Sequence, residues 1–132
     1  MTRAASDTNA CPCGSGLPYA SCCAPLHDGR PAPNAEALMR SRYTAYVLKL
    51  EDYLLQTWHP DTRPAALDLA EETSTKWLGL EVKRFEVTGD DAAIVEFVAR
   101  YKLNGKAEKL QEISRFVKFE KWYYLAAELV KD

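Results

Sequence analysis

Four cysteines lie in one short stretch of the sequence, "CPCGSGLPYASCC", which we call the cysteine loop (residues 11–23). They form two couples, Cys11 with Cys13 and Cys22 with Cys23, and the sequence holds no other cysteine. Four thiols at the two ends of one loop can bind a tetrahedral zinc ion, form disulfides or remain free. The chemistry expected here is therefore that of sulfur.

The surroundings of the couples favour zinc. The first ten residues contain no apolar segment typical of a secretory signal, so the expected compartment is the cytosol, where disulfides do not persist. Pro12 restricts the backbone between the first two thiols. Gly14 and Gly16 permit the positive φ angles with which a loop wraps a metal and aims N–H groups at sulfur. The adjacent Cys22 and Cys23 match the usual iron–sulfur spacings poorly.

A zinc ion held by four sulfurs has no open position for water, so we expect one structural Zn²⁺ and no catalytic residue in the cysteine loop. Zinc binding, on the order of 10 kcal/mol, would fold a segment too short to fold by burial alone. His27 follows the loop and is expected to be a solvent-exposed loop residue, since four thiols complete the coordination. Residues 24–33, rich in Pro, Gly and Asp, indicate a linker.

Length and charge narrow the class of protein to which the chain belongs. A chain of 132 residues fits a single domain. Its 17 basic and 19 acidic residues give a net charge of −2, which is not the basic footprint of a nucleic-acid-binding protein. No segment approaches the roughly 18 consecutive apolar residues of a membrane span. Neither a nucleic-acid partner nor a membrane is therefore expected.

Three helices are predicted after the cysteine loop. The first follows Asn34, a good N-cap, and the second is a short helix over 53–59 that Asp52 caps. The third covers 64–77, with Pro64 at its first position. The first helix carries an apolar stripe at helical spacing: Met39, Tyr43, Tyr46, Val47 and Leu50.

Strands follow the helices. Four consecutive antiparallel strands are predicted over 77–89, 92–105, 109–120 and 121–130, and Asn104-Gly105 is a strong hairpin signal. The second strand alternates, and its inner face is expected to carry Ala93, Val95, Phe97, Ala99, Tyr101 and Leu103. Helices followed by hairpin-linked strands indicate an α+β fold in which a curved sheet covers the helices.

Several polar residues stand amid these apolar patterns. Those that could line a pocket are Arg42, Tyr46, His59, Glu96, Arg100, Glu112 and Arg115. Strand register decides whether the strand residues face a pocket or water, and a cross-strand charge network is their expected role. Arg42 is expected to be solvated or paired with an acid; alternatively it points inward toward a strand acid or an anionic ligand. His59 is expected to close a helix end, with a general base beside Asp61 as the alternative.

The cysteine loop resembles the SEC-C motif, the zinc-binding tail of the SecA translocation ATPase, and its four cysteines stand at the four ligand positions of that motif. In SecA the motif contacts a partner chaperone and the ribosome. The resemblance therefore implies a protein-contact role, for which the small surface around Leu17, Pro18 and Tyr19 is the candidate.

The chain as a whole resembles the bacterial YchJ family. After the cysteine loop come "LMRSRYTAYVLKLEDYLLQTWHP", "WLGLEV", "VEFVARY", "EISRF" and "WYYLAAE", in that order. The resemblance implies a nuclear-transport-factor-2-like (NTF2-like, cystatin-like) cone of three helices on a curved four-stranded sheet, often with a pocket. It divides the chain into a disordered tail (1–10), a SEC-C knuckle with linker (11–33) and an NTF2-like domain (34–132).

Two functions follow as hypotheses. The favoured one is a non-enzymatic cytosolic zinc protein that contacts another protein through the cysteine loop. The alternative is a small-molecule binder or an enzyme, of the isomerase, dehydratase or hydrolase type found in this fold, that uses the pocket of the cone. Many YchJ members carry a second SEC-C knuckle, and none follows "LVKD" here, so a role requiring two is not expected. Homodimers are common among such cones, and Phe85, Val98 or Phe116 could form the contact.

Overall fold

The structure, a computed structural model, describes residues 10–130. The predicted disordered tail lies outside these residues except for Ala10, which forms an isolated bridge with Pro18. The helices are α2 (Cys23–His27), α3 (Ala35–Leu48) and α4 (Glu51–Gln56), with the 3-10 turns η1 (Tyr19–Ser21) and η2 (Leu69–Glu71). The strands are β1 (Thr75–Gly89), β2 (Ala92–Leu103), β3 (Lys106–Phe119) and β4 (Lys121–Leu129). No helix in the described part of the chain is long and apolar enough to cross a membrane.

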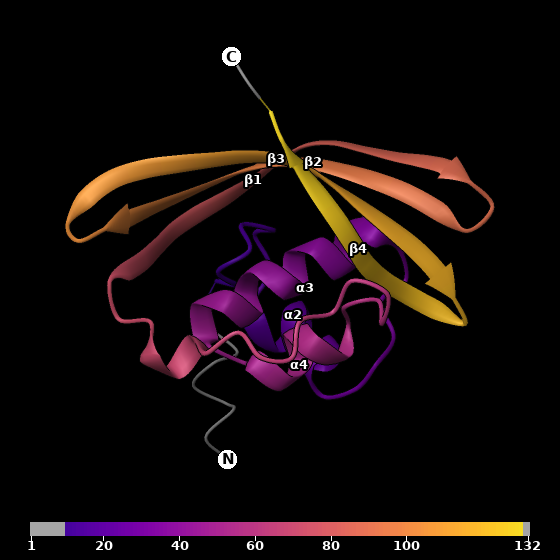
Figure 1. Cartoon of the computed structure of the whole chain (residues 1–132), viewed down its shortest axis with the longest axis horizontal. Coiled ribbons are helices and arrows are strands. Elements are labelled where there is room, and N and C mark those ends of the chain that lie inside the picture. Colours follow the sequence, from indigo (N-terminus) through magenta and orange to yellow (C-terminus); the bar gives the residue numbers. More distant parts are fainter. Residues whose placement is uncertain (1–9, 131–132) are drawn as a thin grey trace.

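The four strands form one antiparallel sheet in the order β1-β2-β3-β4. Figure 1 shows this sheet arching over α3, with α2 and α4 on the side of α3 that faces away from the strands. The order follows from the hairpins, since each strand returns beside the one before it. The predicted α+β class, with three helices on a curved four-stranded sheet, is confirmed.

The third helix is not where the sequence predicted it. In residues 64–77 only η2 is helical, and β1 already begins at Thr75. Asp68 adopts a left-handed conformation with φ of 57°, which a continuing helix does not allow. The Glu72 carboxylate then accepts the N–H groups of Ser74 and Thr75, at 2.7 and 2.8 Å. Bonds from backbone N–H groups to a nearby side chain replace the helical pattern here, so the segment turns into the sheet.

The third helix is instead α2, in the segment predicted to be a linker. Pro25 lies in its first turn, where a missing N–H breaks no helical hydrogen bond. The prediction failed because a helix of five residues leaves no periodic signal.

The other two helices start and stop for local reasons. Asn34 caps α3 as predicted, since its side chain accepts the N–H of Ala37 at 2.8 Å. The predicted cap Asp52 lies inside α4, which begins one residue earlier, at Glu51. The helix ends before Thr57, because the backbone there pairs with β4: His59 N–H donates to Tyr124 O, and Tyr124 N–H donates to Thr57 O, both at 2.8 Å. His59 is therefore bonded to a strand and does not close the helix.

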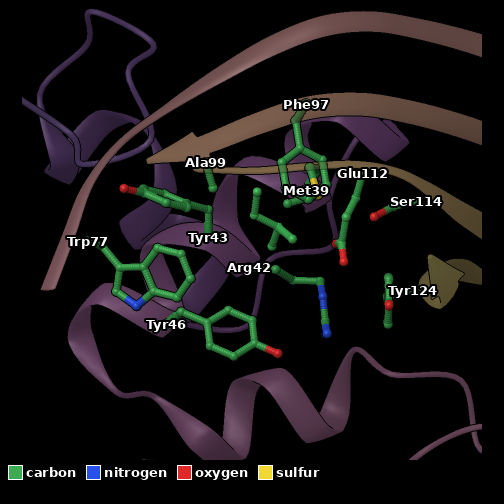
Figure 2. Close-up of a pocket in the computed structure, with 11 residues that line it drawn as sticks. Met39, Arg42, Tyr43, Tyr46, Trp77, Phe97, Ala99, Glu112, Ser114 and Tyr124 are labelled. Carbon is green, nitrogen blue, oxygen red and sulfur yellow. The ribbon is translucent and has the colours of Figure 1, made fainter. Parts of the chain in front are cut away.

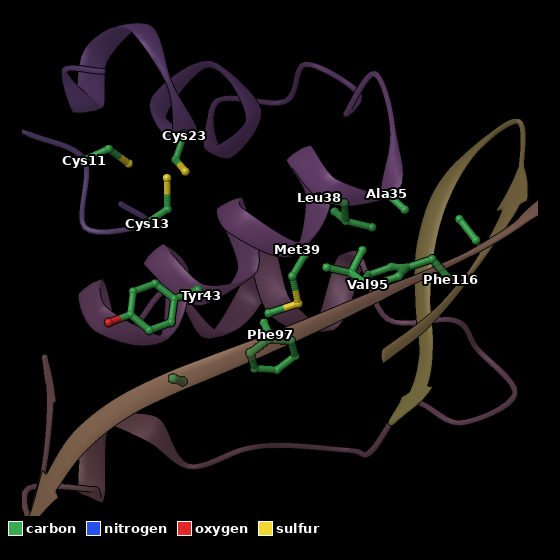
Figure 3. Packing of buried hydrophobic residues seen from close by; sticks show 12 residues of the cluster. Cys11, Cys13, Cys23, Ala35, Leu38, Met39, Tyr43, Val95, Phe97 and Phe116 are labelled. Atoms are coloured by element: carbon green, nitrogen blue, oxygen red, sulfur yellow. The ribbon is translucent and has the colours of Figure 1, made fainter. Parts of the chain in front are cut away.

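The core lies between α3 and the concave face of the sheet. Figure 3 shows Leu38, Met39 and Tyr43 of α3 against the inner residues of β2. Ala93, Val95, Phe97 and Ala99 are all buried there, as the alternation predicted. Cys11, Cys13 and Cys23 belong to the same buried cluster. The cysteine loop is thus packed into the core of the cone.

The residues suggested for a homodimer do not lie on an open surface. Phe116 is 1% exposed and Val98 is 3% exposed, and Phe85 packs against the core cluster. Phe85 and Phe116 belong to the inner face of the sheet, which was missed because strand register was unknown. Neither Val98 nor Phe116 therefore offers an exposed side chain for a dimer contact.

Candidate metal centre and the adjoining cavity

The four cysteine sulfurs converge on one point. All four Sγ atoms lie within 4.8 Å of one another, with 3.6 Å between Cys13 and Cys22 and 3.9 Å between Cys22 and Cys23. Sulfurs about 2.3 Å from a central zinc sit about 3.8 Å apart at the corners of a tetrahedron, whereas a disulfide needs about 2.05 Å. None of the four is in a disulfide. The cysteines are therefore positioned to hold one tetrahedral metal ion.

The close packing of the four sulfurs changes the pKa values of their thiols. Hydrogen bonds from Cys11 and Cys23 lower the pKa of Cys13, and burial raises the pKa of Cys22 to about 11. Hydrogen bonds with Cys11 and Cys13 raise the pKa of Cys23. The sulfurs thus share protons unevenly across one small cluster, and a divalent cation is the usual substitute for such shared protons.

The cysteine loop is closed by its own backbone and seated on β1. Cys11 N–H donates to Leu17 O at 2.9 Å, and Gly14 N–H donates to Cys11 O at 3.1 Å. Gly14 has a φ of +80°, and a Cβ there would lie 2.9 Å from the Leu80 carbonyl oxygen of β1. Glycine is required for both reasons, since no other residue avoids the backbone strain and the contact.

Hydroxyl and guanidinium groups surround the sulfurs. The Ser15 hydroxyl lies 3.1 Å from Cys22 Sγ, and the Thr44 hydroxyl of α3 lies 3.7 Å from Cys11 Sγ. Arg40, one turn earlier on α3, donates from Nη1 to the carbonyl oxygen of Cys13 at 2.8 Å. Donors of this kind orient metal-bound thiolates and offset their charge.

His27 is not a solvent-exposed loop residue, contrary to the prediction. Its Nε2 donates to the Ser41 carbonyl oxygen of α3 at 2.9 Å, and its Nδ1 lies 2.8 Å from the Tyr19 hydroxyl. Its ring also meets the edge of Tyr53 at 4.7 Å between centroids. The imidazole therefore fastens α2 to α3 and lies outside the sulfur cluster.

On the other side of α3 the concave sheet leaves a cavity of about 320 Å³. Its lining consists of Met39, Arg42, Tyr43, Tyr46, Trp77, Phe97, Ala99, Leu110, Glu112, Ser114 and Tyr124. Figure 2 shows Arg42 and Glu112 among aromatic rings from α3, β1 and β4. Three predicted pocket residues, Arg42, Tyr46 and Glu112, line this cavity. Trp77 and Tyr124 were missed as part of a site, because only the register of distant strands brings them together.

The other four predicted pocket residues lie elsewhere. Neighbours along a strand face opposite sides, and Phe97 faces the cavity, so Glu96 faces outward; Arg100 and Arg115 also point away. Glu96 pairs with Arg84 at 3.4 Å and Arg100 with Glu81 at 3.6 Å, in agreement with the cross-strand charge network that was their expected role. Placing these residues, and the exposed Arg115, in the pocket was wrong.

His59 also lies outside the cavity lining, beside β4. Its Nδ1 accepts the N–H of Asp61 at 3.1 Å, and the Asp61 carboxylate, 3.7 Å away, is 81% exposed. A local turn therefore accounts for the proximity of the two residues. Neither His59 nor Asp61 is among the residues that line the cavity, so the pocket prediction for His59 was wrong.

Arg42 is the buried cation of the cavity. Only 3% of it is exposed, and burial lowers its pKa to about 10. Its Nη1 donates to Leu54 O at 2.8 Å and to the Thr57 hydroxyl at 2.6 Å. Its Cζ lies 4.4 Å from the ring centre of Tyr124 and 5.1 Å from that of Trp58. None of the ion pairs found among residues 10–130 includes Arg42.

Two family models match the chain. The model described as "YchJ, middle NTF2-like domain" matches residues 34–127, and that of the SEC-C motif matches residues 8–25. A UPF0225 protein of Chromobacterium violaceum is 56% identical over 123 residues, which cover 89% of this chain and 90% of that protein. A UPF0225 protein of Bordetella parapertussis is 50% identical over 133 residues, which cover 98% of this chain and 99% of that protein.

Two solved structures share the fold. The solution structure of a SEC-C motif containing protein from Rhodopseudomonas palustris has a TM-score of 0.81 and 38% identity, and covers 92% of this chain and 98% of that one. The crystal structure of a SEC-C motif containing protein from Psychrobacter arcticus has a TM-score of 0.79 and 31% identity. It covers 97% of this chain and 86% of that one.

Proposed function

Because the chain belongs to the YchJ family and carries a SEC-C motif, we propose that it binds one structural zinc ion and uses the cysteine loop to contact another protein. The observation that carries the zinc assignment is the set of sulfur separations, which fits the edges of a tetrahedral site. Four sulfur ligands leave no open position on the ion, so the site is structural and not catalytic.

Zinc is favoured among the metals by the donor set. Four thiolates in a tetrahedron select zinc or iron–sulfur chemistry, and the adjacent Cys22 and Cys23 fit cluster spacings poorly. Thiols must stay reduced to bind, so we assign the protein to the cytosol. X-ray absorption at the zinc edge of the purified protein should find four sulfurs at about 2.3 Å. An oxygen or nitrogen ligand in the first coordination shell would contradict the structural assignment.

A groove beside the cysteine loop supports the contact role. It has a volume of about 300 Å³ and lies between the loop and the start of α3, with Ser15, Leu26 and Arg40 in its walls. Leu17 stands at this groove and is 51% exposed. Tyr19, by contrast, is half-buried and held by His27. A partner that places an apolar side chain against Leu17 suits this surface, because removing apolar area of both partners from water is favourable.

The contact role is tested by substituting the exposed leucine and leaving the metal site intact. Leu17→Asp should lose the proteins that wild type captures from its own cytosol, and it should keep its zinc. Leu129→Asp is the matched control, because Leu129 is 63% exposed on β4, at the opposite edge of the sheet from the strand β1 on which the loop docks. If Leu17→Asp and wild type capture the same proteins with equal zinc content, the contact role is wrong and the zinc assignment stands.

A further inference from the structure

The guanidinium of Arg42 has an unused edge inside the cavity. Both hydrogen bonds that Arg42 donates to the protein leave from Nη1, and no hydrogen bond within residues 10–130 is found for Nε or Nη2. No described side-chain nitrogen or oxygen is both sealed from solvent and without a partner. The Nε and Nη2 groups therefore border the open cavity. Figure 2 shows the guanidinium between the Tyr46 hydroxyl and Tyr124.

We propose that this cavity binds a small organic monocarboxylate with an apolar body, and that the Nε–Nη2 edge of Arg42 holds the carboxylate. That edge presents two parallel N–H donors, the geometry that pairs with both oxygens of a carboxylate. A buried guanidinium without an acidic partner is rare, because a cation taken out of water needs compensation. A bound anion supplies that compensation.

The other polar groups of the cavity are compatible with an anion. Burial raises the pKa of Glu112, which favours the neutral carboxyl, a hydrogen-bond donor. Burial also raises the pKa of Tyr46 and of Tyr124, so both hydroxyls keep their protons as further donors. A single guanidinium balances a single negative charge. A phosphate would bring a second charge to a site with one cation, which favours a monocarboxylate.

The apolar residues that line the rest of the cavity determine which ligand would fit there. Trp77 lies against Tyr43 and Tyr46, with ring centroids 5.7 and 6.1 Å away, and Phe97 and Met39 lie opposite. Such a wall suits a flat ring or a short branched chain. The volume of about 320 Å³ lies near the lower end of the range for ligand pockets, roughly 300 to 1,000 Å³, which limits the ligand to a small molecule.

A structural role for Arg42 is the competing explanation. Its bonds to Leu54 O and Thr57 satisfy groups at the end of α4, where a cation is favourable. That role uses Nη1 alone. It accounts neither for the open Nε–Nη2 edge nor for a cavity beside it, and it predicts no preference of the protein for anions.

Sodium benzoate and its neutral isostere benzamide distinguish the two explanations. In NMR titrations of the zinc-loaded full chain, benzoate should give saturable shifts at amides of β2 and β3 that border the cavity. Benzamide should bind at least about tenfold more weakly, because it lacks the charge that Arg42 recognises. No saturable benzoate shift, or equal affinity for both probes, would overturn the proposal, and this comparison in wild type requires no variant to fold.

Variants then assign the preference to one residue. Arg42→Met keeps the length of the side chain and should abolish the preference for benzoate over benzamide. Arg100→Met removes an arginine from the outer face and should leave that preference unchanged. A folded Arg42→Met protein that still prefers benzoate would assign the anion site to another group and refute the proposed geometry. The zinc content, measured in parallel, keeps this outcome separate from failure of the metal site.

Discussion

At the scale of single residues, the cysteine loop owes its shape to glycine and to the sulfurs. Gly14 and Gly16 both have positive φ, +80° and +88°, yet they differ in their surroundings. Gly14 faces the Leu80 carbonyl oxygen, whereas a Cβ on Gly16 would meet nothing within 4 Å. A substitution at Gly16 therefore reports backbone strain alone, whereas a substitution at Gly14 reports backbone strain and the loss of close packing of the loop on β1.

Gly16→Ala should lower the free energy of unfolding by about 1–2 kcal/mol, the cost of placing a Cβ in the left-handed region. Gly14→Ala should lower the free energy of unfolding by more than this, because the new Cβ would clash with the Leu80 carbonyl, a backbone group of β1 that cannot move without distorting the strand. Urea denaturation of both zinc-loaded variants measures the difference. Equal losses would mean that the loop does not dock on β1 as described.

The cysteines were predictable from spacing because metal ligands close in sequence need no knowledge of the fold. Thr44 and Arg40, which reach the same sulfurs and the loop backbone from α3, left no signal of this kind. They are ordinary helix residues until the fold brings them to the loop. Metal ligands that lie close together in the sequence can thus be predicted from it, whereas the residues of α3 that contact them from a distance cannot.

At the scale of elements, α3 carries two different surfaces. Arg40, Ser41 and Thr44 reach the cysteine loop and α2, whereas Met39, Arg42, Tyr43 and Tyr46 line the cavity. The predicted apolar stripe located the second surface correctly. The first was not predicted, because its contacts are polar and its partner α2 was taken for a linker.

His27 provides the test of how α2 is attached to α3. His27→Leu should lower the free energy of unfolding by about 1–3 kcal/mol, since the Ser41 carbonyl and the Tyr19 hydroxyl lose this partner. Tyr19→Phe, which removes only one of these bonds, should cost less. Zinc content should stay unchanged in both variants, because His27 is not a ligand. Loss of zinc on His27→Leu alone would contradict the assignment of the metal to sulfur.

The strands were predicted well and their register was not. Alternation in β2 and the Asn104-Gly105 turn fixed the hairpin, whose strands run to Leu103 and from Lys106. Which of Glu96 and Glu112 enters the cavity depends on register, to which a single sequence gives no direct access. The helix predicted over 64–77 failed for a different and local reason, since the bonds from Ser74 N–H and Thr75 N–H to the Glu72 carboxylate outweighed the helical pattern.

At the scale of the whole molecule, the metal site and the cone share one hydrophobic core. Cys11, Cys13 and Cys23 are 4%, 0% and 2% exposed and pack in the cluster that contains Phe97 and Phe116. Free energy gained by metal binding is therefore available to the entire fold and not to the loop alone.

Removal of the metal should destabilise the whole chain. With a zinc chelator and a thiol reductant, the midpoint of thermal unfolding should fall by more than about 10 °C, since zinc contributes on the order of 10 kcal/mol to such sites. The near-ultraviolet signal of Trp77 and the other aromatic residues should change in the same transition. Restoring zinc should restore the midpoint. An unfolding curve that is identical with and without metal would show that the core does not depend on the site.

The most direct test of the account is a count of metal and thiols on freshly purified protein. One zinc per chain should be found by elemental analysis, and none of the four thiols should react with a thiol reagent until a chelator is added, after which all four should react. Protein that is free of metal, or that shows reactive thiols while zinc is bound, would contradict a site in which all four sulfurs hold the ion.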